Sequence, residues 1–178
     1  MVATLPTDLP IQLFANPAAW EKWLLAHGNA PGLWLKIAKK DKGVVSVTYA
    51  EALDVALCHG WIDGLKRACD DRYFLQRFTP RRPKSLWSKI NVAKVERLIA
   101  EGRMQAGGLR EVEAARADGR WQAAYHAASG MEVPPELAAA LAKNAKARRF
   151  FEQLDGTNRY AFCWRVHTAK KPEARNVR

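Results

Sequence analysis

The sequence predicts an α+β fold, in which a small antiparallel sheet packs with several helices and a helical C-terminal portion follows. Short apolar segments bounded by turn residues are typical of strands, and they fall within residues 32–78. Pro134-Pro135 then marks a boundary, after which the sequence carries helix signals. We therefore expect an α+β domain over residues 1–130 and a helical C-terminal subdomain over residues 131–178.

The helices of the first part are predicted by residues that favour helix ends. Asn or Thr caps the free N–H groups of a first turn, Pro fits that turn, and Gly ends a helix. The clearest signal is the capping box formed by Thr48 and Glu51. By these signals the predicted helices lie between Asn16 and Gly28, between Thr48 and Gly60, between Asn91 and Gly102, and over residues 109–117.

Three short segments are predicted to be strands, namely residues 32–38, 65–69 and 73–78. The last two flank a polar turn of three residues, which is the spacing of a hairpin. Alternation along the third strand places Phe74 and Phe78 on one face and Arg77 on the other. We expect the Phe face to be the core face, so Arg77 should point away from the core.

The C-terminal helices are predicted over residues 135–143, 145–154 and 157–168. Asn144 separates the first two, and Asp155-Gly156 separates the second from the third. All three lie within the predicted C-terminal subdomain.

Composition indicates a folded chain with reduced thiols. Of the 178 residues 48% are hydrophobic and seven are Trp, which is enough for a packed core and excludes a disordered polypeptide. No apolar run approaches the roughly 18 residues that span a bilayer, and residues 1–10 lack the features of a secretory signal. We therefore expect a cytoplasmic protein without a membrane span, whose three Cys are reduced.

The net charge of +11 is concentrated in two segments. Residues 64–94 carry +7 and residues 165–178 carry +4, so the rest of the chain is neutral. This local excess predicts an anionic small molecule or an acidic partner. The alternative is that the long side chains only solvate two exposed segments.

Two runs of residues carry a resemblance to a known family. They are EALDVALCHGWIDG from Glu51 and RFTPRRPKSLWSKIN from Arg77, and the tail AKKPE from Ala169 adds to them. Together they resemble the YdeI/OmpD-associated family, also called bacteriocin-protection-like proteins, over nearly the whole chain. The resemblance implies a link to bacteriocin resistance or to an outer-membrane porin, and it implies no particular reaction.

The candidate ligand site joins these two runs. Its residues are cationic, aromatic or polar, and they are Trp61, Asp63, Arg77, Thr79, Arg81, Arg82, Trp87 and Lys89. We expect the three Arg side chains to bind the anion, Trp87 to stack on the ligand and Asp63 to orient an Arg. The other interpretation is that Trp61 and Trp87 belong to the core.

Two further functions stay open. Glu51, Asp54 and Cys58 share one helical face, so the chain could be an enzyme for a small anionic substrate, with Asp54 or Asp63 as the acid–base group. Basic and aromatic residues also alternate around the hairpin, which fits salt-sensitive nucleic-acid binding. The sequence carries no motif for a cofactor or a metal ion, because its four His are dispersed and it lacks a phosphate-binding glycine loop.

Overall fold

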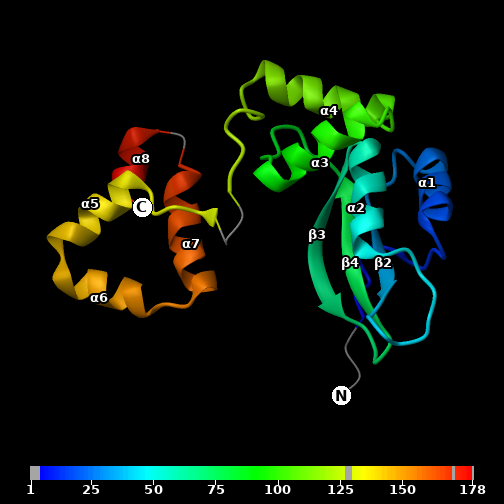
Figure 1. Ribbon diagram of the computed structural model, residues 1–178, viewed down its shortest axis with the longest axis horizontal. Helices are drawn as coiled ribbons and strands as arrows, with labels where there is room; N and C mark the ends of the chain where they lie inside the picture. The colour runs from blue at the N-terminus through cyan, green and yellow to red at the C-terminus, as the bar shows by residue number, and fades with distance from the viewer. Residues whose placement is uncertain (1–4, 127–129, 170, 178) are drawn as a thin grey trace. The chain divides into compact units, whose positions relative to one another are not determined.

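The computed structural model describes residues 5–126, 130–169 and 171–177, and the chain divides into two compact units. The first unit comprises Met1–Trp87 and Asn91–Ala124, and the second comprises Ser88–Ile90 and Tyr125–Arg178. In order, the elements are β1 (Ile11–Gln12), α1 (Pro17–Ala26), β2 (Leu33–Ala38), α2 (Tyr49–Cys58), β3 (Trp61–Ala68), β4 (Tyr73–Pro80), α3 (Lys89–Ala100), α4 (Ala106–Ala117), α5 (Pro135–Lys143), α6 (Ala145–Gln153), α7 (Gly156–His167) and α8 (Pro172–Val177) (Figure 1). The predicted α+β class is confirmed, because four strands form one sheet and helices form the C-terminal part.

The sheet has the strand order β1-β2-β4-β3, so β3 lies at one edge. β4 pairs antiparallel with both of its neighbours, and Trp34 of β2 lies opposite Arg77 of β4. β1 pairs parallel with β2, and the sequence did not predict it because two residues are too few to show alternation. The sheet is therefore mixed at the β1 edge and antiparallel elsewhere.

The predicted hairpin is confirmed, although both of its strands are longer than expected. β3 begins at Trp61, directly after α2, and β4 continues to Pro80. Asp70 holds the turn between them, because its Oδ1 accepts hydrogen bonds from the backbone N–H groups of Arg72 at 2.9 Å and Tyr73 at 2.8 Å.

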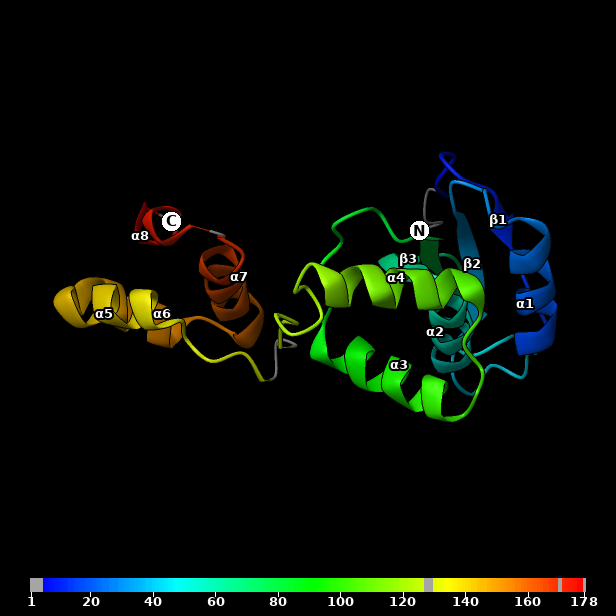
Figure 2. The ribbon, with the colours of Figure 1, turned by 90° about the horizontal axis from the view of Figure 1, so that it is seen from above.

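One face of the sheet carries the main core. Leu33 and Leu35 of β2 and Phe78 of β4 are fully buried there, together with residues of α1 and α2. Trp20 of α1 joins them, and its indole N–H donates to the carbonyl of Ala52 at 3.1 Å. Figures 1 and 2 show α1 and α2 beside the sheet. Burying each of these large side chains contributes roughly 1.5–3 kcal/mol to folding.

A smaller apolar cluster covers the opposite face of the sheet. It contains Trp34, Cys69 and Leu75, and Leu9 and Ile11 of the N-terminal segment pack against it. Alternation in β4 predicted a core only on the face that carries Phe74 and Phe78. Leu75 is buried as well because a segment far away in the sequence lies over it.

The helix ends of the first part follow from their capping residues. Asn16 accepts a hydrogen bond from the backbone N–H of Ala19 at 2.9 Å at the start of α1. The capping box of Thr48 and Glu51 is present at the start of α2, and Gly60 follows the helix with φ of 78°. These three predictions are confirmed.

Two helices begin earlier than the sequence predicted. α3 begins at Lys89, so Asn91 lies inside its first turn and does not cap it. α4 begins at Ala106 and includes Gly108, where a Cβ atom would lie 2.3 Å from the carbonyl oxygen of Cys58. Glycine is normally unfavourable in a helix, and here it allows the close approach of α4 to the end of α2.

The second unit contains α5 to α8 and a small set of buried side chains. The predicted separators are confirmed as caps, because Asn144 begins α6 and Asp155 begins α7. Phe151, Cys163 and Val166 are buried between the helices. The sequence did not predict the short helix α8. Within the described ranges, no helix combines the length and apolar character required to cross a bilayer.

Candidate functional site

A shallow hollow lies beside β3, β4 and the loop that follows β4. Its lining residues are Ile62, Gly64, Leu65, Arg77, Thr79, Pro80, Arg82 and Ser85. The hollow has a volume of about 230 Å³ and presents two guanidinium groups and two hydroxyls. No carboxylate is among the described residues that line it. Three residues of the predicted site, Arg77, Thr79 and Arg82, therefore come together here.

A β-bulge in β3 shapes this hollow. The register of β3 against β4 shifts between Asp63 and Lys66, so two residues of β3 lie opposite Arg77. Gln76 secures the bulge, because its buried amide Nε2 donates to the carbonyl of Gly64 at 2.8 Å. Gly64 has no side chain, so nothing from this position covers the aliphatic stem of Arg77.

Arg77 lies on the face of the sheet away from the main core, where it packs over Trp34. The guanidinium carbons of Arg77 and Arg67 lie 5.9 Å and 5.4 Å from the centre of the Trp34 ring system. The Nε atom of Arg77 is buried and has no hydrogen-bond partner among the described residues. Leaving such a donor unsatisfied costs free energy.

One carboxylate lies close to Arg77 from outside the hollow lining. Oδ2 of Asp8 is 3.5 Å from Nη2 of Arg77, and Oδ1 of Asp8 accepts a hydrogen bond from the indole N–H of Trp34 at 2.9 Å. The hydrogen bond from Trp34 lowers the pKa of Asp8, and the charges of Arg77 and Arg67 act in the same direction. Asp8 is therefore ionised at neutral pH and partly neutralises Arg77.

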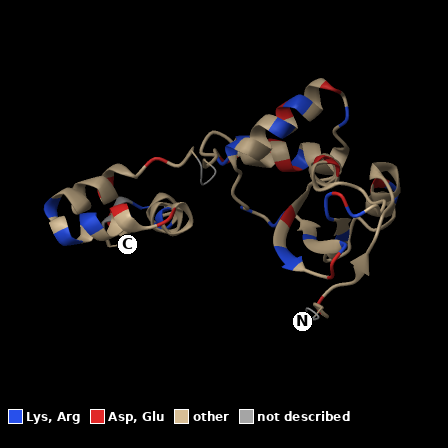
Figure 3. Cartoon of the chain, turned by 60° about the horizontal axis from the view of Figure 1, so that its bottom comes forward, with Lys and Arg blue, Asp and Glu red and all other residues tan. Residues whose placement is uncertain are grey.

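The loop after β4 holds Arg82 and Ser85 beside the strand. The backbone N–H of Ser85 donates to the carbonyl of Arg82 at 3.0 Å, and Nη1 of Arg120 donates to the carbonyl of Ser85 at 2.8 Å. Arg120 is itself oriented by an ion pair with Asp118 at 2.7 Å. The loop backbone is thus fixed, while the Arg82 side chain is exposed. Basic segments of the hairpin and this loop appear in blue in Figure 3.

Arg81, Trp61 and Trp87 are buried and do not line the hollow. They are 6%, 2% and 2% exposed. The guanidinium carbon of Arg81 lies 3.7 Å from the centre of the Trp87 ring system, and its Nη2 donates to the carbonyl of Leu86 at 2.7 Å. Trp121 packs against Trp87 as well. The structure favours the interpretation that both tryptophans are core residues, because Trp87 offers no free ring face for stacking.

Asp63 and Lys89 are likewise not among the residues that line the hollow. Asp63 accepts a hydrogen bond from the hydroxyl of Tyr49 at 2.8 Å, and no Arg pairs with Asp63 in the described part of the chain. Lys89 begins α3, and its backbone N–H donates to the carbonyl of Tyr125 at 2.8 Å within the second unit.

The three residues considered for catalysis have structural partners. Glu51 completes the capping box, and hydrogen bonds from Thr48 lower its pKa. Burial raises the pKa of Asp54, but hydrogen bonds from Lys94, at 3.0 Å, and from Arg97 outweigh it, so the pKa lies below its ordinary value. Each carboxylate therefore stays ionised and paired at neutral pH.

Cys58 is equally unsuited to nucleophilic chemistry. Its side chain is 2% exposed, and burial raises the pKa of its thiol to about 11. The fraction of thiolate at neutral pH is therefore very small. In the part of the chain that the structure describes, no three His, Cys, Asp or Glu side chains are placed to hold a metal ion.

Several residues of the hollow were not predicted from the sequence. Gly64 and Ser85 belong to the quoted runs, but nothing in their residue types indicates binding. Arg67 and Asp8 reach the neighbourhood of Arg77 only through the pairing of strands and the path of the N-terminal segment. The bulge was the missing information, because strand alternation assumes a regular register.

Comparisons with known proteins give two family matches. Residues 12–111 match a family described as a domain of unknown function, DUF8412. Residues 130–178 match the family described as "Bacteriocin-protection, YdeI or OmpD-Associated". No curated protein and no solved structure matches the chain.

These matches divide the predicted resemblance between two parts of the chain. The YdeI/OmpD-associated match confirms the resemblance over the C-terminal residues, whereas the runs that begin at Glu51 and Arg77 fall within the other match. The hollow lies wholly within residues 12–111. Because that match covers more than half of the 178 residues, the chain belongs to the DUF8412 family and carries a C-terminal segment of the YdeI/OmpD-associated type.

Proposed function

We propose that the protein binds a small anion, or the anionic group of a larger ligand, in the hollow beside β3 and β4. One observation carries this proposal. Arg77 and Arg82 line the same hollow as the hydroxyls of Thr79 and Ser85, and no carboxylate is among its described lining residues. Guanidinium groups bind carboxylate and phosphate through two parallel hydrogen bonds, and hydroxyls add further donors.

The size of the hollow limits the ligand. Pockets for drug-sized molecules have volumes of about 300–1,000 Å³, and this hollow has about 230 Å³. A phosphate, a small dicarboxylate or one phosphorylated end of a longer molecule fits this range. Arg67 lies on the same face of the sheet, so it adds positive potential without lining the hollow.

Two other functions have less support. An enzyme needs a group with free acid or base capacity, and Glu51, Asp54 and Asp63 are each held by hydrogen bonds or ion pairs. Nucleic-acid binding uses exposed aromatic faces as stacking platforms, whereas Phe78 of the hairpin is buried and the Lys36 ammonium lies over the ring of Tyr73. Binding to nucleic acid would also weaken steeply with salt.

Isothermal titration calorimetry of the whole chain with inorganic phosphate, pyrophosphate and citrate at two salt concentrations tests the proposal. We expect Arg77→Gln and Arg82→Gln each to weaken binding about tenfold. Lys22→Gln is the matched control, because Lys22 is exposed on α1 and the change in net charge is the same. Circular dichroism establishes that each variant is folded.

The proposal fails if both Arg variants bind as tightly as the wild type, or if Lys22→Gln weakens binding to the same extent. It also fails if only long oligonucleotides bind and modest salt abolishes the effect. Arg81→Ala is unsuitable for this test, because Arg81 is buried against Trp87 and its loss changes stability.

A further inference from the structure

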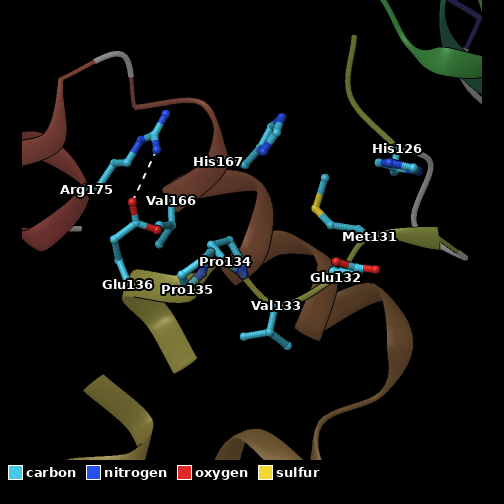
Figure 4. Close-up of a pocket in the computed structure, with 10 residues that line it drawn as sticks. All are labelled: His126, Met131, Glu132, Val133, Pro134, Pro135, Glu136, Val166, His167 and Arg175. Carbon is cyan, nitrogen blue, oxygen red and sulfur yellow. Dashed lines mark hydrogen bonds and ion pairs between the residues drawn. The ribbon is translucent and has the colours of Figure 1, made fainter. Parts of the chain in front are cut away.

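The second unit contains a pocket of its own, with a volume of about 320 Å³. Its described lining comes from the segment before α5, the first turn of α5, the end of α7, and α8: His126, Met131, Glu132, Val133, Pro134, Pro135, Glu136, Val166, His167 and Arg175. Figure 4 shows Glu136 and Arg175 at one end, Met131 and Glu132 toward the other, and His167 between them. No residue of the proposed anion site takes part.

The charge of this pocket is opposite to that of the chain. Its lining includes two carboxylates, Glu132 and Glu136, and one guanidinium, Arg175, in a chain of net charge +11. Nη1 of Arg175 pairs with Oε1 of Glu136 at 3.2 Å, and Nε of Arg175 donates to the carbonyl of Ala169 at 3.0 Å. The one cationic side chain of the described lining is therefore already engaged.

Glu132 has no hydrogen-bond or ion-pair partner among the described residues, and its side chain lies at the pocket. The excess negative charge of the lining is therefore concentrated at one end. The Glu132 side chain is exposed, so an added charged group can reach it. An external cation is the group that would neutralise Glu132.

The start of α5 does not offer an anion site. Such a helix end normally attracts anions through its free N–H groups. Here Pro135 has no N–H group. The carboxylate of Glu136 accepts a hydrogen bond from its own backbone N–H, and this bond lowers the pKa of Glu136 more than the hydrogen bond from Arg175 does. The carboxylate of the chain itself thus occupies the position that an anion would take.

Apart from His126 and His167, the remaining described lining is apolar. Val133, Pro134 and Val166 provide an aliphatic surface between the two carboxylates, and Met131 lies beside Glu132. A ligand with a positive group on a short alkyl stem would place the stem on this surface and the charge at Glu132.

We infer that this pocket binds an alkyl ammonium group. The group belongs either to a free diamine or to a lysine side chain of a peptide. Both have a primary ammonium at the end of an unbranched alkyl chain, so the ammonium can lie at Glu132 while the chain lies on the apolar surface. The site is independent of the proposed anion site, since the two share no residue.

The test is a titration of the whole chain followed by NMR of the Met131 methyl group and the His167 imidazole. Four probes are compared. 1,5-Diaminopentane and the capped tripeptide acetyl-Gly-Lys-Gly-amide represent the two sources of the ammonium group, and 1,5-pentanediol and glutarate are the neutral and anionic controls. We expect the first two, or one of them, to shift both signals, whereas the neutral and anionic probes of equal length leave them unchanged. The probe that binds more tightly identifies the source of the ammonium group.

Glu132→Gln should weaken the binding of the ammonium probe by about two- to fivefold. Glu152→Gln is the matched control, because Glu152 lies exposed on α6 in the same unit and is absent from the pocket lining. The inference is overturned if glutarate binds as well as the diamine, if neither ammonium probe shifts the signals at millimolar concentration, or if Glu132→Gln binds like the wild type. An equal loss in Glu152→Gln would likewise show a general charge effect and overturn it.

Discussion

The carboxylate of Asp8 lies 3.5 Å from Nη2 of Arg77, so a negative charge from the N-terminal segment lies beside the proposed anion site. The hydrogen bond from Trp34 fixes this carboxylate and keeps it ionised. An incoming anion therefore meets an Arg77 that is already partly neutralised. Asp8 should consequently limit the affinity of the hollow.

Asp8→Asn tests this relationship. The Asn side-chain oxygen can still accept from the indole N–H of Trp34, but the negative charge is lost. We expect phosphate or citrate to bind about three- to tenfold more tightly in calorimetry. Asp71→Asn, in the exposed hairpin turn, changes the net charge equally and should leave the affinity within twofold. Equal affinities of Asp8→Asn and the wild type would mean that Arg77 does not contact the anion.

Gly108 is expected to be intolerant of any side chain. A Cβ atom there would lie 2.3 Å from the carbonyl oxygen of Cys58 and 2.7 Å from that of Leu57. Both contacts are with backbone, so α4 must move away from α2. Gly108→Ala should lower the free energy of unfolding by about 3 kcal/mol in urea denaturation, despite the better helix propensity of Ala.

Gly28→Ala is the control for this measurement. The nearest atom to a Cβ at Gly28 is the carbonyl oxygen of Leu24 at 3.7 Å, which is an ordinary contact. Its effect should be below about 1 kcal/mol. Equal effects of the two substitutions would show that α4 is not held close to α2.

Gln76 should contribute to both stability and binding. Its buried amide donates to the carbonyl of Gly64 and so secures the bulge that opens the hollow. Gln76→Met keeps the length of the side chain and removes the donor. We expect a loss of about 1–2 kcal/mol in the free energy of unfolding and weaker phosphate binding.

Gln122→Met provides the comparison, because Gln122 is exposed. Gln122→Met should change neither the free energy of unfolding nor the affinity for phosphate. If Gln76→Met loses stability but retains full affinity, the shape of the bulge does not matter for the anion, and the role of Gln76 is structural alone.

Asp70 should make the stability of the first unit depend on pH in the acid range. Partial desolvation acts to raise the pKa of Asp70, but hydrogen bonds from the backbone of Arg72, from Lys36 and from the backbone of Tyr73 outweigh it and lower the pKa to about 2. A carboxylate with a lowered pKa in the folded state stabilises the fold above its unfolded value of 3.8, and this contribution is lost as the pH falls toward 2.

Asp70→Asn should therefore be less stable than the wild type at pH 6, and the difference should shrink between about pH 4 and pH 2. Urea titrations at several pH values measure it. Asp71→Asn should follow the wild-type pH dependence, since Asp71 is exposed beside the same turn. A difference between Asp70→Asn and the wild type that is constant with pH would contradict this assignment.

Local signals in the sequence were sufficient for the helices whose ends carry capping residues. The capping box at Thr48, the cap at Asn16 and the separators Asn144 and Asp155 all act within three residues of the group they bind. Such signals can be recognised without a structure because both partners lie in one short segment. The same holds for the hairpin, whose turn at Asp70 is a local hydrogen-bonded feature.

The arrangement of the site depended on residues far apart in the chain. The sequence identified Arg77, Thr79 and Arg82 as a group, but it also included Arg81 and Trp87, which pack against each other in the interior. Nothing in residue type distinguishes Arg81 from Arg82, because burial is decided by the path of the loop and by Trp121 packing beside Trp87. The pocket of the second unit was likewise invisible in the sequence, since Glu132 and Arg175 are more than 40 positions apart.

By itself, the sequence determined the α+β class, the helix ends that carry capping residues, the presence of the hairpin and the concentration of positive charge, because each rests on neighbouring residues or on composition. Only the tertiary structure decided which cations reach a common hollow, that Asp8 lies beside Arg77, and that a bulge at Gly64 opens the site. The physical reason is that strand register and chain crossings bring together groups with no local relationship, and packing then determines which side chains are buried and which meet the ligand.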